Sequence, residues 1–123
     1  MTIESYVLRL GEVRFAAKIG AFRGERAKAQ ELVVSVDLTL PHAALARRDR
    51  LKEVVDYGPI IDAVVEVGMA TEYRLLECYA QDLAKRLFAD TRAQTIRISV
   101  TKAVVPSPHR VATAAVELVA HRS

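Results

Sequence analysis

The stretch ELVVSVDLTL, residues 31–40, alternates in a way that decides the fold. Leucine or valine occupies every even position, while Ser35, Asp37 and Thr39 stand between them. Successive side chains of a β-strand point to opposite faces, so this period of two is typical of a strand that is buried on one side. The stretch therefore predicts a strand in an antiparallel sheet with one covered face.

A second alternating stretch precedes this strand and begins at Tyr6. Its apolar residues keep one parity as far as Leu10 and take the opposite parity from Val13 onward. A change of parity within one strand predicts a β-bulge or a tight turn, here at Gly11. The polar, glycine-bearing segment IGAFRGERAKAQ, residues 19–30, is predicted to be the hairpin loop that joins the two strands.

The remaining elements follow from two helical patterns and two further alternating patterns. Apolar residues recur at helical spacing in residues 54–70, where Pro59 suits a first turn, and again in residues 75–88. TIRISVTK, residues 95–102, and residues 112–120 are predicted strands. The order β-β-α-α-β-β predicts an α+β fold, with a four-stranded antiparallel sheet and both helices on one face.

Composition limits the class of protein. The 123 residues show no linker, repeat or low-complexity segment, so residues 1–123 are predicted to be a single domain. No apolar run approaches the roughly 20 residues of a membrane span, and the N-terminus lacks a signal-peptide layout. The lone Cys78 excludes an internal disulfide and fits a reducing cytoplasm. The net charge of +3 is scattered along the chain. We therefore expect a cytoplasmic protein that binds neither membranes nor nucleic acid.

Glu77 lies in the opening turn of the second predicted helix. An acid there complements the helix dipole by about 0.3–1 kcal/mol. On a helical wheel, however, Glu77 falls between Ala84 and Phe88, at the edge of the buried stripe. A carboxylate at that edge is costly unless it has a partner. The pattern alone favours a structural role and leaves a binding role open.

Lys102 has the same parity as Ile98 and Val100 and is predicted to point to the covered face where its strand ends. A lysine at a sheet edge usually extends its ammonium group past the edge into water. A partly desolvated lysine can instead lose its charge and act as an acid or base. Spacing alone favours the first explanation.

Other polar residues are less informative by pattern. Tyr57 precedes a predicted helix, where tyrosines usually pack, and Glu25 lies in the predicted loop, where charges are usually solvated. His42, His109 and His121 are widely separated, and no pair has the spacing of metal ligands. No glycine-rich phosphate loop is present. We expect neither a metal nor another cofactor.

Four motifs together are nevertheless specific: IGAFRGERAKAQ, VVDYGPII, YRLLECYAQDLAKRLF and SVTK. In their order, spacing and predicted elements they resemble the dihydroneopterin aldolase family over essentially the whole chain. The shared pattern is G-x-x-x-x-E-R-x-x-x-Q, a V-D-Y before a helix, L-L-E at a helix start and a lysine that ends a strand. This resemblance implies the tunnelling fold, in which protomers join their sheets into a ring. It also implies a homo-octamer, or a tetramer, with active sites at subunit interfaces.

The resemblance also assigns substrate-binding residues. Glu77 matches the glutamate with which the family holds a pterin, and a carboxylate can accept both hydrogen bonds of the pterin's amino and ring N–H groups. Backbone groups near Leu76 and Val55 are expected to complete the pocket. Tyr57 is expected to come from across the subunit interface and to lie over or beside the bound pterin.

The catalytic residues implied by the resemblance are Lys102 and Glu25, as acid and base, together with Tyr57. The implied reaction belongs to folate biosynthesis and cleaves 7,8-dihydroneopterin into 6-hydroxymethyl-7,8-dihydropterin and glycolaldehyde. The pterin ring itself accepts the electrons, so neither a metal nor a lysine Schiff base is required.

The chain departs from the family after the strand-end lysine. Ala103 stands where proline is usual, and the following AVVPSPHR is not the usual continuation. A relative with this fold that tends to lack the proline epimerises dihydroneopterin triphosphate at C2′, so this reaction is an alternative. Arg23, Arg26 and Arg110 are candidates to bind a triphosphate. An alternative of another class is a ring-forming pterin-binding module without catalysis.

Overall fold

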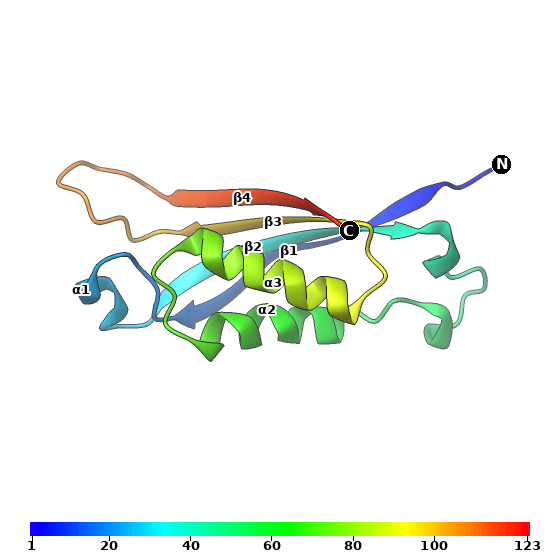
Figure 1. The fold of residues 1–123 in the computed structure, drawn as a ribbon, viewed down its shortest axis with the longest axis horizontal. Helices are drawn as coiled ribbons and strands as arrows, with labels where there is room; N and C mark the ends of the chain where they lie inside the picture. Colours follow the sequence, from blue (N-terminus) through cyan, green and yellow to red (C-terminus); the bar gives the residue numbers. More distant parts are fainter.

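One antiparallel sheet of four strands runs the length of the molecule in the computed structural model, which describes all residues from 1 to 123 (Figure 1). The strands neighbour one another in chain order: β1 (Ser5–Ala17), β2 (Gln30–Pro41), β3 (Thr95–Lys102) and β4 (Ala114–His121). The predicted second and third strands are confirmed to within one residue at each end. The fourth begins two residues later than predicted. In this order β1 and β4 are the two edges of the sheet.

The predicted break in β1 is a β-bulge. Leu10 pairs with Val36, but the next pair is Val13 with Val34, so two residues of β1 oppose the single Ser35. The strained position is Glu12, with a φ of 54°, and not Gly11. The backbone N–H of Glu12 donates a hydrogen bond of 3.0 Å to the Ser35 hydroxyl, which holds the bulge closed.

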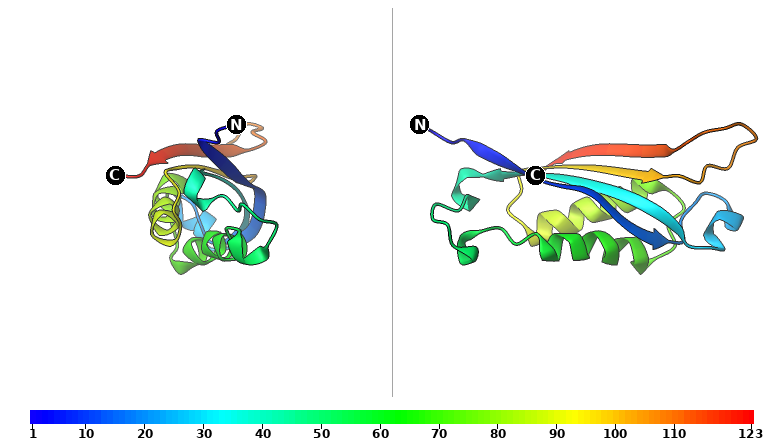
Figure 2. Two further views of the ribbon diagram at one scale, coloured as in Figure 1. Left: turned by 90° about the vertical axis from the view of Figure 1, so that its right-hand side faces the viewer. Right: turned by 180° about the vertical axis from the view of Figure 1, so that it is seen from behind.

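Two helices, α2 (Gly58–Ala70) and α3 (Leu76–Asp90), cover one face of the sheet, as the end-on view in Figure 2 shows. Pro59 lies in the first turn of α2, where its missing N–H costs nothing. The Gly58 N–H donates to the Asp56 carboxylate at 3.0 Å and marks the point where the helix begins. The α+β arrangement predicted from the element order is confirmed.

The hydrophobic core lies between the sheet and these helices. The even-numbered residues of β2 from 32 to 40 are each 1% exposed or less, as the alternation predicted; they are Leu32, Val34, Val36, Leu38 and Leu40. Helix α2 approaches β1 closely at Gly68, where an added Cβ would lie 2.5 Å from the Phe15 ring. Glycine there allows the helix to pack directly on an aromatic side chain.

The segment predicted as a simple hairpin loop contains a one-turn helix, α1 (Arg23–Arg26). The prediction failed because four residues are too few to show helical periodicity. The turn begins where the Phe22 N–H donates to the Glu25 carboxylate at 3.3 Å. None of the helices is both long and apolar enough to cross a membrane.

Candidate active site

Glu25 and Lys102 meet although 77 residues separate them in the chain. The Lys102 ammonium donates a hydrogen bond of 2.6 Å to the Glu25 carboxylate. Lys102 reaches the helix-covered side because its parity matches that of buried Val100, as predicted. Both side chains are largely shielded from water, with 12% of the lysine and 9% of the glutamate exposed. The attraction within an ion pair this protected is screened by water less than on the surface, and it opposes the cost of desolvating both charges.

The environment of Glu25 fixes its charge. Burial on its own would raise the pKa of the carboxyl group, because it disfavours the charged form. Hydrogen bonds from Lys102 and from the backbone at Phe22 and Ala21, with the lysine's charge, outweigh burial and lower the pKa. The carboxylate is therefore ionised at neutral pH. It places a proton acceptor beside a proton donor, the arrangement that general acid–base catalysis requires.

Hydrogen bonds hold the loop that carries Glu25. Their donors and acceptors could not be predicted from the sequence. Arg26 donates to the Gly20 carbonyl at 2.8 Å, and the Gln30 amide nitrogen donates to the Ile19 carbonyl at 2.6 Å. The Gly20 N–H donates in turn to the carbonyl of Tyr73 at 3.0 Å. The spacing G-x-x-x-x-E-R-x-x-x-Q was the available signal, but it does not reveal which atoms meet. Because Arg26 is engaged with the backbone, it is less free to bind a triphosphate than predicted.

The first turn of α3 lies at the same end of the molecule as α1 and the end of β3 (Figure 1). Leu76 is buried at 8% exposure, but Glu77 is exposed, which corrects its predicted place at the edge of the buried stripe. Gln81, one turn further along the same face of α3, is exposed as well, and its amide donates to the Glu77 carbonyl at 3.2 Å. No hydrogen bond or ion pair within the chain involves the Glu77 carboxylate.

Val55 and Tyr57 lie at the other end. Val55 is half-buried and shares a shallow hollow with Thr91 and Arg92, just beyond the C-terminal end of α3. The Tyr57 side chain is 57% exposed. The fifteen residues of α3 are about 22 Å long and separate this end from Glu77. One chain therefore brings Glu25 and Lys102 together at the end that carries Leu76 and Glu77, but it does not bring Val55 and Tyr57 to them.

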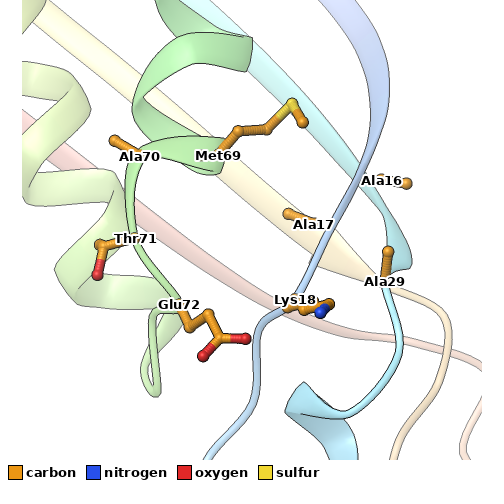
Figure 3. A pocket seen from close by; sticks show the side chains of 9 residues that line it. Ala16, Ala17, Lys18, Ala29, Met69, Ala70, Thr71 and Glu72 are labelled. Atoms are coloured by element: carbon orange, nitrogen blue, oxygen red, sulfur yellow. The ribbon is translucent and has the colours of Figure 1, made fainter.

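A separate hollow of about 360 Å³ lies between the ends of β1 and α2 (Figure 3). Met69, Lys18 and Glu72 are among the side chains that line it. None of the predicted site residues lines this hollow. No three histidine, cysteine, aspartate or glutamate side chains in the chain come close enough together to hold a metal ion.

The architecture is that of the tunnelling fold. The chain superposes on the Escherichia coli dihydroneopterin aldolase, solved in complex with neopterin, with a TM-score of 0.82. The superposition covers 94% of this chain and 98% of that one, at 21% sequence identity. A Burkholderia dihydroneopterin aldolase bound to guanine gives a TM-score of 0.79 at 26% identity, covering 98% of this chain and 93% of that one.

The sequence comparison narrows this class to a family of enzymes. The dihydroneopterin aldolase family model matches residues 8–119. The Methylorubrum extorquens dihydroneopterin aldolase is 26% identical over 108 residues, which cover 87% of this chain and 83% of that protein. The chain belongs to the dihydroneopterin aldolase family, whose members are lyases.

Proposed function

We propose that the chain cleaves 7,8-dihydroneopterin by a retro-aldol reaction and releases 6-hydroxymethyl-7,8-dihydropterin and glycolaldehyde. The observation that carries this proposal is the Glu25–Lys102 pair, which unites an acceptor and a donor at 2.6 Å beside the first turn of α3. Membership of the family supports it, and the motif resemblance assigns the acid and base roles to these two residues. The reaction breaks a carbon–carbon bond and needs proton transfers that such a pair can serve.

In the proposed mechanism a base removes the proton of the 2′-hydroxyl group, and the C1′–C2′ bond breaks. The bond's electrons enter the N5=C6 imine of the ring, N5 is protonated, and the C2′–C3′ fragment leaves as glycolaldehyde. The resulting enol then loses the N5 proton and gains one at C1′ to give the hydroxymethyl product. We assign the 2′-hydroxyl proton to the Glu25 carboxylate, which accepts it and returns it at C1′. We assign the N5 proton to the Lys102 ammonium group, which donates it and later takes it back. Acid–base catalysis of this kind contributes roughly 10²–10⁴-fold, and substrate positioning supplies much of the rest.

We assign the binding of the pterin edge to Glu77, supported by the backbone near Leu76. The carboxylate lies exposed in the first turn of α3 without a partner in its own chain, so it is available to a ligand. Guanine, which the Burkholderia relative binds, presents the same paired amino and ring N–H donors as a pterin. A carboxylate accepts such a pair through both of its oxygens.

We propose that each protomer is a single domain and that a second copy of the chain completes the site with its Val55 and Tyr57. These residues lie about a helix length from Glu77 within one chain, and Tyr57 is exposed. Edge strands β1 and β4 each have one side without a strand partner, so copies can join edge to edge into a ring. The expected assembly is a homo-octamer, or a tetramer. A monomer measured by light scattering at micromolar concentration would contradict it.

Product analysis tests the proposed reaction. The purified chain is incubated with 7,8-dihydroneopterin and, separately, with its triphosphate, and the products are separated by chromatography. Release of 6-hydroxymethyl-7,8-dihydropterin with glycolaldehyde supports the aldolase. Conversion of the triphosphate to its C2′ epimer without cleavage would favour the epimerase, for which Ala103 after Lys102 is the sequence argument. Binding of either compound without turnover would leave a pterin-binding module.

A further inference from the structure

Gly20 occupies a backbone conformation that side chains rarely adopt, with a φ of 151°. The Glu25 side chain lies directly over its α-carbon. A Cβ added at Gly20 would stand 2.6 Å from the carboxyl carbon of Glu25 and 2.8 Å from Oε1, and would be closer still to its Cβ. Real Cβ atoms essentially never come so near other heavy atoms. The Glu25 side chain can take its observed position only because residue 20 has no side chain.

Both neighbouring peptide groups of Gly20 are also fixed. Its N–H donates to the Tyr73 carbonyl at 3.0 Å, and its carbonyl accepts from Arg26 at 2.8 Å. Tyr73 is itself anchored, because it is 9% exposed and its hydroxyl donates to Asp82 of α3 at 2.7 Å. Tyr73 precedes Leu76 by three residues, so the hydrogen bond at Gly20 connects the Glu25 loop to the start of α3.

We propose that Gly20 is a positioning residue, which seats the Glu25 carboxylate against Lys102 and fixes this pair relative to the first turn of α3. The hydrogen bond to Tyr73 thereby fixes the position of the proton-transfer groups relative to the pterin-binding residues. This inference rests on the proposed function for its effect on catalysis. The position of the Glu25 side chain over Gly20, the Glu25 seat, is a geometric property and can be tested without turnover.

Gly24 provides a matched control in the same loop. A Cβ added there meets no heavy atom within 4 Å, and its backbone conformation suits any residue. A purely local effect of replacing glycine by alanine in this loop would appear equally at both positions. An effect that requires the Glu25 seat would appear only at Gly20.

The kinetic experiment compares Gly20→Ala, Gly24→Ala, Glu25→Ala and the double variant Gly20→Ala/Glu25→Ala. We expect Gly20→Ala to lower kcat at least about tenfold with KM within about twofold, since the pair acts in the transition state. Gly24→Ala should match the wild type. The double variant should be no slower than Glu25→Ala within about twofold, because residues that act through one group are not additive. Wild-type kcat in Gly20→Ala, or a further large loss in the double variant, would overturn the inference.

A crystal structure of Gly20→Ala decides the geometry independently of activity. We expect the distance between Lys102 Nζ and the Glu25 carboxylate to exceed the hydrogen-bond limit of about 3.5 Å. A pair that persists at 2.6 Å overturns the inference even if the variant is slow. If the wild-type chain cleaves no dihydropterin, the proposed function fails, while this distance still tests the seat.

Should Gly20→Ala not fold, Arg26→Gln is the second test, because it removes the hydrogen bond that Arg26 donates to the Gly20 carbonyl. It should lower kcat at least about threefold at unchanged KM, and a wild-type kcat would overturn the inference.

Discussion

The two ends of the molecule differ in how far a single chain completes them. At one end, Glu25 and Lys102 are shielded, paired and held by hydrogen bonds that reach as far as Tyr73. At the other end, Tyr57 is 57% exposed and its hydroxyl takes part in no hydrogen bond within the chain. The first end holds a protected acid–base pair, whereas the second presents an exposed aromatic side chain.

This difference indicates which parts of the proposed site one chain supplies and which parts a second copy supplies. Proton transfer needs groups placed within a few tenths of an ångström, and a folded chain supplies that through its own core and loops. Covering a flat ring needs only an apolar surface on the other side, which a second copy can bring. The predictions below test whether the ends differ in this way.

The largest effect is expected at the shielded end, for Lys102→Ala. The change removes the proton donor of the proposed acid–base pair, so kcat should fall at least about 100-fold while KM changes less than about threefold. Lys28→Ala is the matched control, because Lys28 is an exposed lysine in the loop that carries Glu25. Steady-state kinetics on the substrate that the wild type turns over is the measurement. A kcat within about threefold of the wild type would remove Lys102 from the mechanism.

The next test asks whether the two ends meet in different copies. Tyr57→Ala should lower activity by itself, and Lys102→Ala should be nearly inactive. If the two variants are unfolded and refolded together, about one quarter of the sites in a randomly mixed symmetric assembly would combine an intact Lys102 with an intact Tyr57. Activity above the sum of the separately refolded variants is therefore expected. Activity equal to that sum would show that the two residues do not share a site.

How much of this could be read from the sequence depended on the range of the interaction. The alternation in residues 31–40 predicts the buried face of β2 because side-chain direction in a strand is a local property. The parity of Lys102 predicted its side for the same reason. The family resemblance gave Lys102 and Glu25 acid–base roles but did not predict their contact, since the partners are 77 residues apart and the loop's place is set by a hydrogen bond to Tyr73.

Two other features could not be predicted for different reasons. The helix α1 is a single turn, which carries no periodic signal. Glu77 was placed by a helical wheel, which gives direction around the helix but not how far the sheet extends to cover it. Its exposure became apparent only when helix and sheet were seen together, and it makes Glu77 more accessible to a ligand than the wheel suggested.

A smaller effect is expected for Glu77→Gln, which tests binding at the shielded end without touching the proton-transfer pair. The amide keeps the shape but turns one acceptor into a donor, which then faces the donor pair of the pterin. Mispaired polar groups of this kind cost about 1–3 kcal/mol, so pterin affinity should weaken at least about tenfold. Fluorescence titration measures it, and Glu72→Gln, an exposed glutamate of the preceding connector, is the control. Unchanged affinity would leave Glu77 only its role at the helix start.

The smallest expected effect concerns Tyr73, whose hydrogen bonds give the shielded end its rigidity. Burial and then the hydrogen bond to Asp82 raise the pKa of Tyr73 to about 12, from an ordinary value near 10. Tyr73→Phe removes the 2.7 Å bond to Asp82 and should lower the free energy of unfolding by about 1 kcal/mol at neutral pH.

The pH dependence of this difference distinguishes the tyrosine from a simple change in packing. A group with a raised pKa in the folded state stabilises it fully below the pKa of the unfolded chain and loses that contribution as the pH rises through the folded value. The advantage of the wild type over Tyr73→Phe should therefore be constant up to about pH 10 and shrink between about pH 10 and 12. Chemical denaturation of both proteins at matched pH values measures it. A difference that stays constant across this range would show that the Tyr73 hydroxyl does not hold its proton through the bond to Asp82, and the shielded end would be less rigid than its geometry indicates.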